Sequence, residues 1–121
     1  MNLKLFAYPK MVEKALIILN QPNNGKYEEI IRILNGPKII EFFNCIMQRN
    51  DVTVDGHAYS IWFGERMTMK QVPNIGKRLR ERIKSDYLDA TNWINLEMNT
   101  NYLPSDIQAI VWVCHKRIYK I

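Results

Sequence analysis

Apolar residues recur at helical spacing along most of this chain. After Pro9, which suits the first turn of a helix, they stand at i, i+3, i+4 and i+7, as Val12, Ala15, Leu16 and Leu19. Residues 21–25 are Gln-Pro-Asn-Asn-Gly, a composition that ends helices. The pattern therefore predicts a first helix that starts at Pro9 and stops before Gln21.

The same periodicity predicts more helices, separated by Gly, Pro and Asn. They cover Lys26 to about Leu34, Pro37 to about Gln48, Gly56 to about Phe63, Lys77 to about Met98, and a last segment that starts at Pro104. Between them, Val52-Thr53-Val54 alternates like a strand but is too short for a sheet, so we expect an extended link. Residues 64–73 are expected to form a loop or a short helix.

In the helix from Pro37, the apolar positions divide the residues into two faces. Those expected to be buried are Ile39, Ile40, Phe43, Ile46 and Met47, and those expected to be more open are Lys38, Glu41 and Asn44. With 121 residues, the chain is long enough for one core and short for two. We predict an all-α fold, a compact bundle of five or six helices in one domain, residues 1–121.

Composition excludes several classes of protein. Hydrophobic residues make up 47% and charged residues 24%, which is typical of a globular protein and argues against disorder. No run of about 18 apolar residues is present to span a membrane, and the first residues lack the apolar centre of a secretory signal. We expect a soluble, cytoplasmic protein without a membrane partner.

The cysteine and histidine content predicts no cofactor and no metal site. The two cysteines, Cys45 and Cys114, stand in apolar helical patterns without a C-x-x-C pair, so two buried free thiols are expected. The two histidines form no H-E-x-x-H motif. His115 is expected to be a capping cation near a helix C-terminus.

The net charge of +5 favours an acidic partner such as DNA. The positive residues gather in two places, where Lys77, Arg78, Arg80, Arg82 and Lys84 stand against Glu81 alone, and where Lys116, Arg117 and Lys120 follow near the end. Proteins that never bind nucleic acid can be equally basic, so the positions of these cations matter more than their number.

A short turn at Asn35-Gly36 joins two predicted helices. Left-handed backbone there would end the first helix, and Pro37 would begin the second. Such a turn presents backbone N–H groups at a helix N-terminus, where they can bind a DNA phosphate. An ordinary αα-hairpin uses similar residues and is the alternative.

Lys38 and Asp55 lie on either side of one predicted helix and its extended link. Both side chains could therefore face one cleft. A lysine amine can attack carbon to form a Schiff base, and a carboxylate can stabilise the cationic sugar that forms as a base departs. These groups suit cleavage of an N-glycosidic bond. Asp55 also suits the N-cap of the helix that starts at Gly56.

In these residues the sequence resembles the helix-hairpin-helix DNA glycosylases, whose members carry a hairpin L-P-G-V-G-R-K and, after a helix, V-D-T-H. Gly36-Pro37-Lys38 corresponds to the end of that hairpin, and Val54-Asp55-Gly56-His57 to V-D-T-H. The resemblance implies that Lys38 is the nucleophile, that Asp55 is the essential carboxylate and that His57 has a supporting role. The turn at Asn35 and Gly36 would contact DNA.

A second resemblance covers more of the chain. The segments 38–44, 52–58 and 108–112 are similar to a group of small, uncharacterised phage and prophage proteins. This resemblance implies a phage protein and brings no assigned activity.

A further DNA-binding hairpin is indicated by Val72-Pro73-Asn74-Ile75-Gly76-Lys77-Arg78-Leu79, which has a P-x-I-G-x-x-L pattern. The residues expected to hold the DNA backbone here are Asn74, Gly76, Lys77, Arg78 and Arg80. The alternative is a Pro/Gly loop before a solvated basic helix. Trp62, Trp93 and Trp112 are expected in the core, although an aromatic ring beside a pocket could fill the gap left by a flipped base.

Three functions follow from these patterns. The first is a DNA-binding, glycosylase-like enzyme that acts on a flipped base by N-glycosidic bond cleavage. The second is a non-catalytic DNA- or partner-binding protein, indicated by Ile33 and Leu34 in place of the hairpin's proline and first glycine. The third is an enzyme of modified-pyrimidine DNA metabolism that uses the same cleft.

Overall fold

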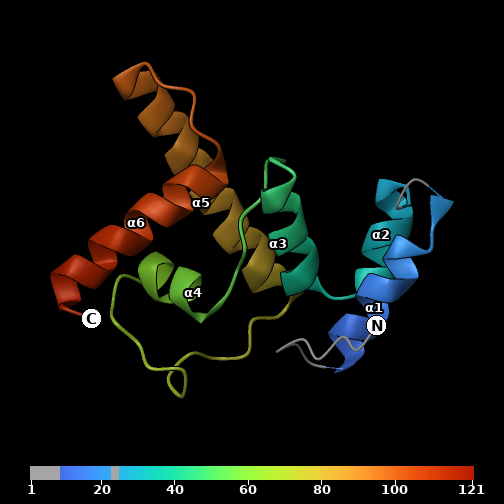
Figure 1. The fold of residues 1–121 in the computed structure, drawn as a ribbon. Coiled ribbons are helices and arrows are strands. Elements are labelled where there is room, and N and C mark those ends of the chain that lie inside the picture. The colour runs from blue at the N-terminus through green and yellow to red at the C-terminus, as the bar shows by residue number, and fades with distance from the viewer. Residues whose placement is uncertain (1–8, 23–24) are drawn as a thin grey trace. The chain divides into compact units, whose positions relative to one another are not determined.

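The computed structural model describes residues 9–22 and 25–121, and these contain six helices and no strand (Figure 1). The helices are α1 (Pro9–Leu19), α2 (Tyr27–Leu34), α3 (Pro37–Ile46), α4 (Gly56–Phe63), α5 (Lys77–Met98) and α6 (Pro104–Tyr119). The predicted all-α fold is confirmed. Among the described helices, none combines the length and apolar character that crossing a membrane requires.

The chain forms two compact units, Met1–Ile40 and Glu41–Ile121, with the boundary inside α3. In the N-terminal unit, the Lys14 amine donates a hydrogen bond to the carbonyl of Leu34 at the end of α2. Asn35 then takes left-handed backbone with φ 45° and ends α2, as the sequence predicts. Of the turn expected after α1, residues 23 and 24 lie outside the described residues.

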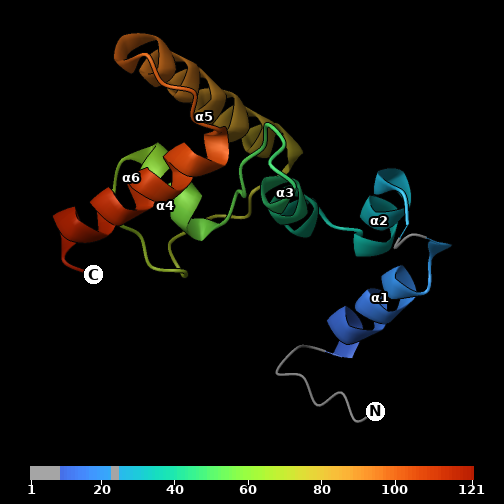
Figure 2. The same ribbon diagram turned by 45° about the horizontal axis from the view of Figure 1, so that its top comes forward.

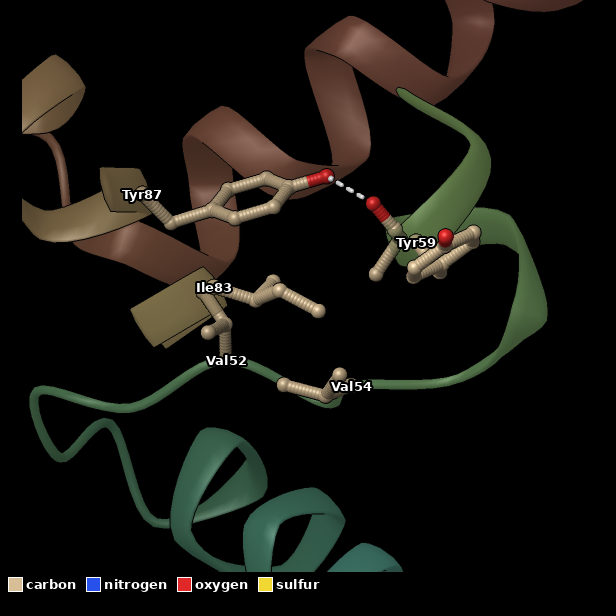
Figure 3. Packing of buried hydrophobic residues seen from close by; sticks show 6 residues of the cluster. Val52, Val54, Tyr59, Ile83 and Tyr87 are labelled. Carbon is tan, nitrogen blue, oxygen red and sulfur yellow. Dashed lines mark hydrogen bonds between the residues drawn. The ribbon is translucent and has the colours of Figure 1, made fainter. Parts of the chain in front are cut away.

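The C-terminal unit is built where α4, α5 and α6 pack together (Figures 1 and 2). Its buried apolar cluster consists of Val52, Val54, Ala58, Tyr59, Ile83 and Tyr87. Figure 3 shows Val52 and Val54 of the extended link gathered with Ile83 of α5. Burying a side chain of this size contributes about 1.5–3 kcal/mol, so the alternating link supplies core as well as connection.

The link has no neighbouring strand, and side chains bond its backbone instead. The N–H of Val54 donates to Glu41 Oε1 at 2.9 Å, and the carbonyl of Val54 accepts from Arg80 at 3.1 Å. The side-chain amide of Gln108 bonds Thr53 twice, accepting from its N–H at 3.0 Å and donating to its carbonyl at 2.7 Å. Buried backbone groups need such partners.

Glu41 is buried, with 1% of its surface exposed, although the helical pattern predicts a more open position. Its carboxylate pairs with Arg80 and, at 2.9 Å, with Lys84, which also lies 3.1 Å from Asp51. Burial acts to lower the pKa of Lys84, but Glu41 and Asp51 raise it by more, so the pKa lies above its ordinary value. Two cations from α5 therefore offset the cost of burying the Glu41 charge.

Several other predicted positions are wrong. Ile46 and Met47 are 62% and 55% exposed, because α3 ends at Ile46 and Gln48 takes left-handed backbone. Trp93 is 65% exposed on the outer part of α5. Cys114 is an exposed free thiol rather than the buried one expected.

Replacing Glu41 with alanine should destabilise the protein by about 3–5 kcal/mol, because the change leaves the Arg80 and Lys84 cations without their shared partner. Urea unfolding followed by circular dichroism measures this loss. Glu81→Ala, an exposed change on α5, is the matched control and should stay within about 0.5 kcal/mol of the wild type. Equal stability of the two variants would contradict the role given to Glu41.

Stability should fall as pH rises above about 10, near where tyrosine and lysine lose protons in an unfolded chain. Burial raises the pKa of Tyr87, whose hydroxyl donates to the carbonyl of Ala58 at 3.2 Å, so folding holds this proton to higher pH. The raised pKa of Lys84 acts in the same direction. Both contributions are complete below the unfolded pKa and are lost as pH rises through the folded one.

Urea unfolding between pH 8 and 11.5 measures this decline. Tyr87→Phe should make it shallower, and Tyr102→Phe, at a residue 39% exposed, should leave it unchanged. The same slope in Tyr87→Phe and the wild type would show that Tyr87 does not cause the decline.

Candidate functional site

A cavity of about 320 Å³ lies within the C-terminal unit. Its walls come from α3, the extended link, α4 and α6, and consist of Phe42, Cys45, Thr53, Asp55, His57, Ala58, Ile61, Ser105, Gln108, Ala109 and Trp112. Two residues predicted as site residues, Asp55 and His57, are thus brought together beside an aromatic side chain, Trp112.

Asp55 occupies the predicted N-cap of α4. Its backbone is extended, and Oδ1 accepts the N–H of Ala58 at 2.8 Å. This bond fixes the carboxylate at the junction of the link and α4. The two Gln108 bonds hold Thr53, two residues before Asp55, so the cavity wall at this point is bonded to α6 as well.

An aromatic row runs from His57 along α6. The ring centroids are 4.1 Å apart for His57 and Trp112, 5.9 Å for Trp112 and His115, and 4.7 Å for His115 and Tyr119. His115 is only 8% exposed and lies inside α6, so it does not take the predicted place of a capping cation. Trp112 lines the cavity, and its ring offers a surface on which a planar ligand could stack.

Cys45 is the thiol on the cavity wall. Burial raises the pKa of Cys45, and the Asp51 and Glu41 charges raise it too, while Thr53 and Lys84 act against them. Its sulfur lies 3.4 Å from the Asp51 carbonyl and 3.6 Å from Thr53 Oγ1. A thiol that stays protonated is a poor nucleophile, so Cys45 serves as packing at the cavity.

Lys38 does not lie in the same compact unit as Asp55. It is exposed in the first turn of α3 and belongs to the N-terminal unit, as do Asn35 and Gly36 of the turn that precedes it. The lining of the described cavity does not include it. The catalytic pairing of Lys38 with Asp55 stays a prediction, and the geometry of the C-terminal unit concerns Asp55 and His57.

The second expected hairpin is a loop. Residues 64–76 are not helical, so no helix precedes Gly76, which is the N-cap of α5. Asn74, Lys77 and Arg78 are exposed there. Arg80 is engaged in the ion pair with Glu41 and the bond to Val54, with 14% of its side chain exposed. It therefore has a structural role that its place in a basic run does not indicate.

Sequence patterns also leave two further features unassigned. A second cavity of about 200 Å³ shares His57 and Trp112 with the first and includes Arg66 and His115. A hollow near the end of α6 is lined by Lys116, Arg117 and Lys120. The described residues include no group of three or more His, Cys, Asp or Glu side chains arranged to hold a metal ion.

A family model, described as a family of unknown function (DUF7178), matches residues 7–118. No curated protein matches the chain, and no solved structure matches it.

Proposed function

The chain belongs to this DUF7178 family, and we propose that its C-terminal unit binds DNA and holds one flipped base in the cavity beside Trp112. The observation that carries the proposal is that Asp55, His57 and Trp112 line one cavity. At about 320 Å³, the cavity reaches the size of small-molecule sites, which begin near about 300 Å³. Its mostly apolar wall with a few polar groups suits a planar heterocycle.

Asp55 is the residue placed for chemistry on such a base. As the bond between C1′ of the sugar and the base nitrogen breaks, its electron pair leaves with the base, which takes up a proton. The Asp55 carboxylate would stabilise the sugar cation, and water would then add to C1′ and release a proton. The products are a free base and an abasic site. This hydrolytic route needs no lysine, so it is independent of Lys38.

Two of the other polar groups on the cavity wall are less free to act on the base. The Gln108 amide is engaged with Thr53, and the Cys45 thiol stays protonated. The His57 ring contacts the Trp112 ring at a tilt of 38°, which suits a supporting role beside the carboxylate. The wall that faces the base would thus be Trp112 and the apolar residues, with Asp55 as its charged group.

The DNA backbone would run along the basic end of α6. Lys116 Nζ lies 5.8 Å from the centre of the Trp112 ring, which connects this basic hollow with the aromatic row. Lys116, Arg117 and Lys120 would supply the phosphate contacts that give DNA-binding proteins most of their non-specific affinity. The exposed Lys77 and Arg78 at the start of α5 are a second basic surface in the same unit.

Replacing Lys116, Arg117 and Lys120 together with glutamine should reduce the slope of log affinity against log salt by about 2–3, since each lost phosphate contact removes about 0.9. Fluorescence anisotropy with duplex and single-stranded DNA measures the slope. Lys10, Lys26 and Arg32 are exposed in the N-terminal unit, and their replacement by glutamine removes the same charge. An equal loss of slope in both triple variants would show that only the net charge matters and would contradict a DNA-binding surface at the end of α6. The double variant Lys77→Gln/Arg78→Gln tests the second basic surface, at the start of α5.

Asp55→Asn should abolish base release by at least about a hundredfold while leaving the fold intact, because asparagine caps a helix about as well as aspartate. Liquid chromatography of bases freed from DNA that carries damaged and modified bases measures the activity. Lys38→Ala should retain it, and borohydride should trap no covalent product. Undiminished release by Asp55→Asn would exclude the proposed role of Asp55.

A non-catalytic DNA-binding protein is the alternative, and one observation favours it. The Asp55 carboxylate is already used as the cap of α4, a role that explains an aspartate there without any chemistry. This alternative expects DNA affinity that depends on the α6 cations and no base release from any substrate by the wild type.

A further inference from the structure

The second cavity differs in chemistry from the first. It is lined by the cationic Arg66 and the rings of His57, His115 and Trp112, together with two methionines, two hydroxyl residues and Ile121, and none of these side chains is acidic. The first cavity contains Asp55. The rings of His57 and Trp112, whose centroids lie 4.1 Å apart, belong to both cavities, so they form a shared wall.

Arg66 is the free cation of this second cavity. Its side chain is exposed and makes no hydrogen bond or ion pair with any residue that the structure describes. The hydroxyl groups nearby are already used as donors, since Ser60 donates to the carbonyl of Gly56 at 2.9 Å and Thr68 lies 3.3 Å from Gln71 Oε1. The donors left for a ligand are the Arg66 guanidinium and the two imidazole rings.

We propose that this second cavity binds the phosphate group of the nucleotide whose base occupies the first cavity. A guanidinium forms strong, paired hydrogen bonds with phosphate oxygens, and the imidazoles add further donors. A base on one side of the His57–Trp112 wall and a phosphate on the other would place one nucleotide across both cavities. This proposal depends on the proposed function in one respect only, namely that the base of the same nucleotide occupies the first cavity.

The phosphate could belong to a DNA strand or to a free nucleotide, and the binding chemistry is the same. The probes are therefore the four 2′-deoxynucleoside 5′-monophosphates, the matching nucleosides, inorganic phosphate, and a single-stranded DNA hexamer. Amide chemical shifts of the full-length protein, followed during titration, give both the affinity and the residues affected.

The monophosphates should bind at least about tenfold more tightly than the nucleosides, the effect of one charge-assisted hydrogen bond. Arg66→Gln should remove this difference, and Lys70→Gln, which removes an exposed cation from the same loop, should preserve it. The hexamer should show the same Arg66 dependence if the phosphate comes from a strand.

Equal affinity for nucleosides and monophosphates would overturn the phosphate site. So would a preference that survives Arg66→Gln but disappears when Lys116, Arg117 and Lys120 are replaced, because the phosphate would then bind at the end of α6. Arg66-dependent phosphate binding without any shift at Thr53 or Ala58 would uphold the phosphate site while contradicting the base cavity. The two proposals can therefore fail separately.

Discussion

The C-terminal unit depends on one buried carboxylate. Glu41 is 1% exposed and bonds the N–H of Val54 while pairing with Arg80 and Lys84 of α5. A buried charge is costly unless it is paired and hydrogen-bonded, and Glu41 has both kinds of partner. Through this group α3, the extended link and α5 are held in one arrangement, which allows Val54 to reach the core.

The extended link, residues 52–54, also determines the geometry of the site. Its backbone is bonded by Glu41 and Arg80 at Val54 and by the amide of Gln108 at Thr53, so side chains replace the neighbouring strands of a sheet. Asp55 follows directly and caps α4. A carboxylate fixed between a bonded link and a helix start has little freedom, which is what a catalytic or binding group needs. The three-residue link therefore contributes to both the core, through Val52 and Val54, and the base cavity, through Thr53.

The helices and their caps could be predicted from the sequence because these features are local. The bounds of α4 and α5, the left-handed Asn35 and the cap at Asp55 agree with the structure. Long-range partners could not be predicted in this way. The helical pattern places Glu41 on the exposed face of its helix. Its burial is explained by the cations of α5, some forty residues away in the sequence.

The same limit applies to the candidate site. Asp55 and His57 were expected to share a site and do share a cavity, because they are only two residues apart at the start of α4. Arg66, in an irregular loop, has no local pattern that indicates a cavity beside His115 of α6. Trp112 and Trp93 have the same residue type, but one lines the cavity and the other is 65% exposed, a difference that depends on packing between helices.

Nuclear Overhauser effects between a bound single-stranded DNA and the protein would show whether a base occupies the cavity with Asp55. We expect contacts from base protons to the Trp112 ring and to the methyl groups of Ala58 and Ala109, which line the cavity. Bound DNA whose base protons contact none of these groups would contradict this placement of the base.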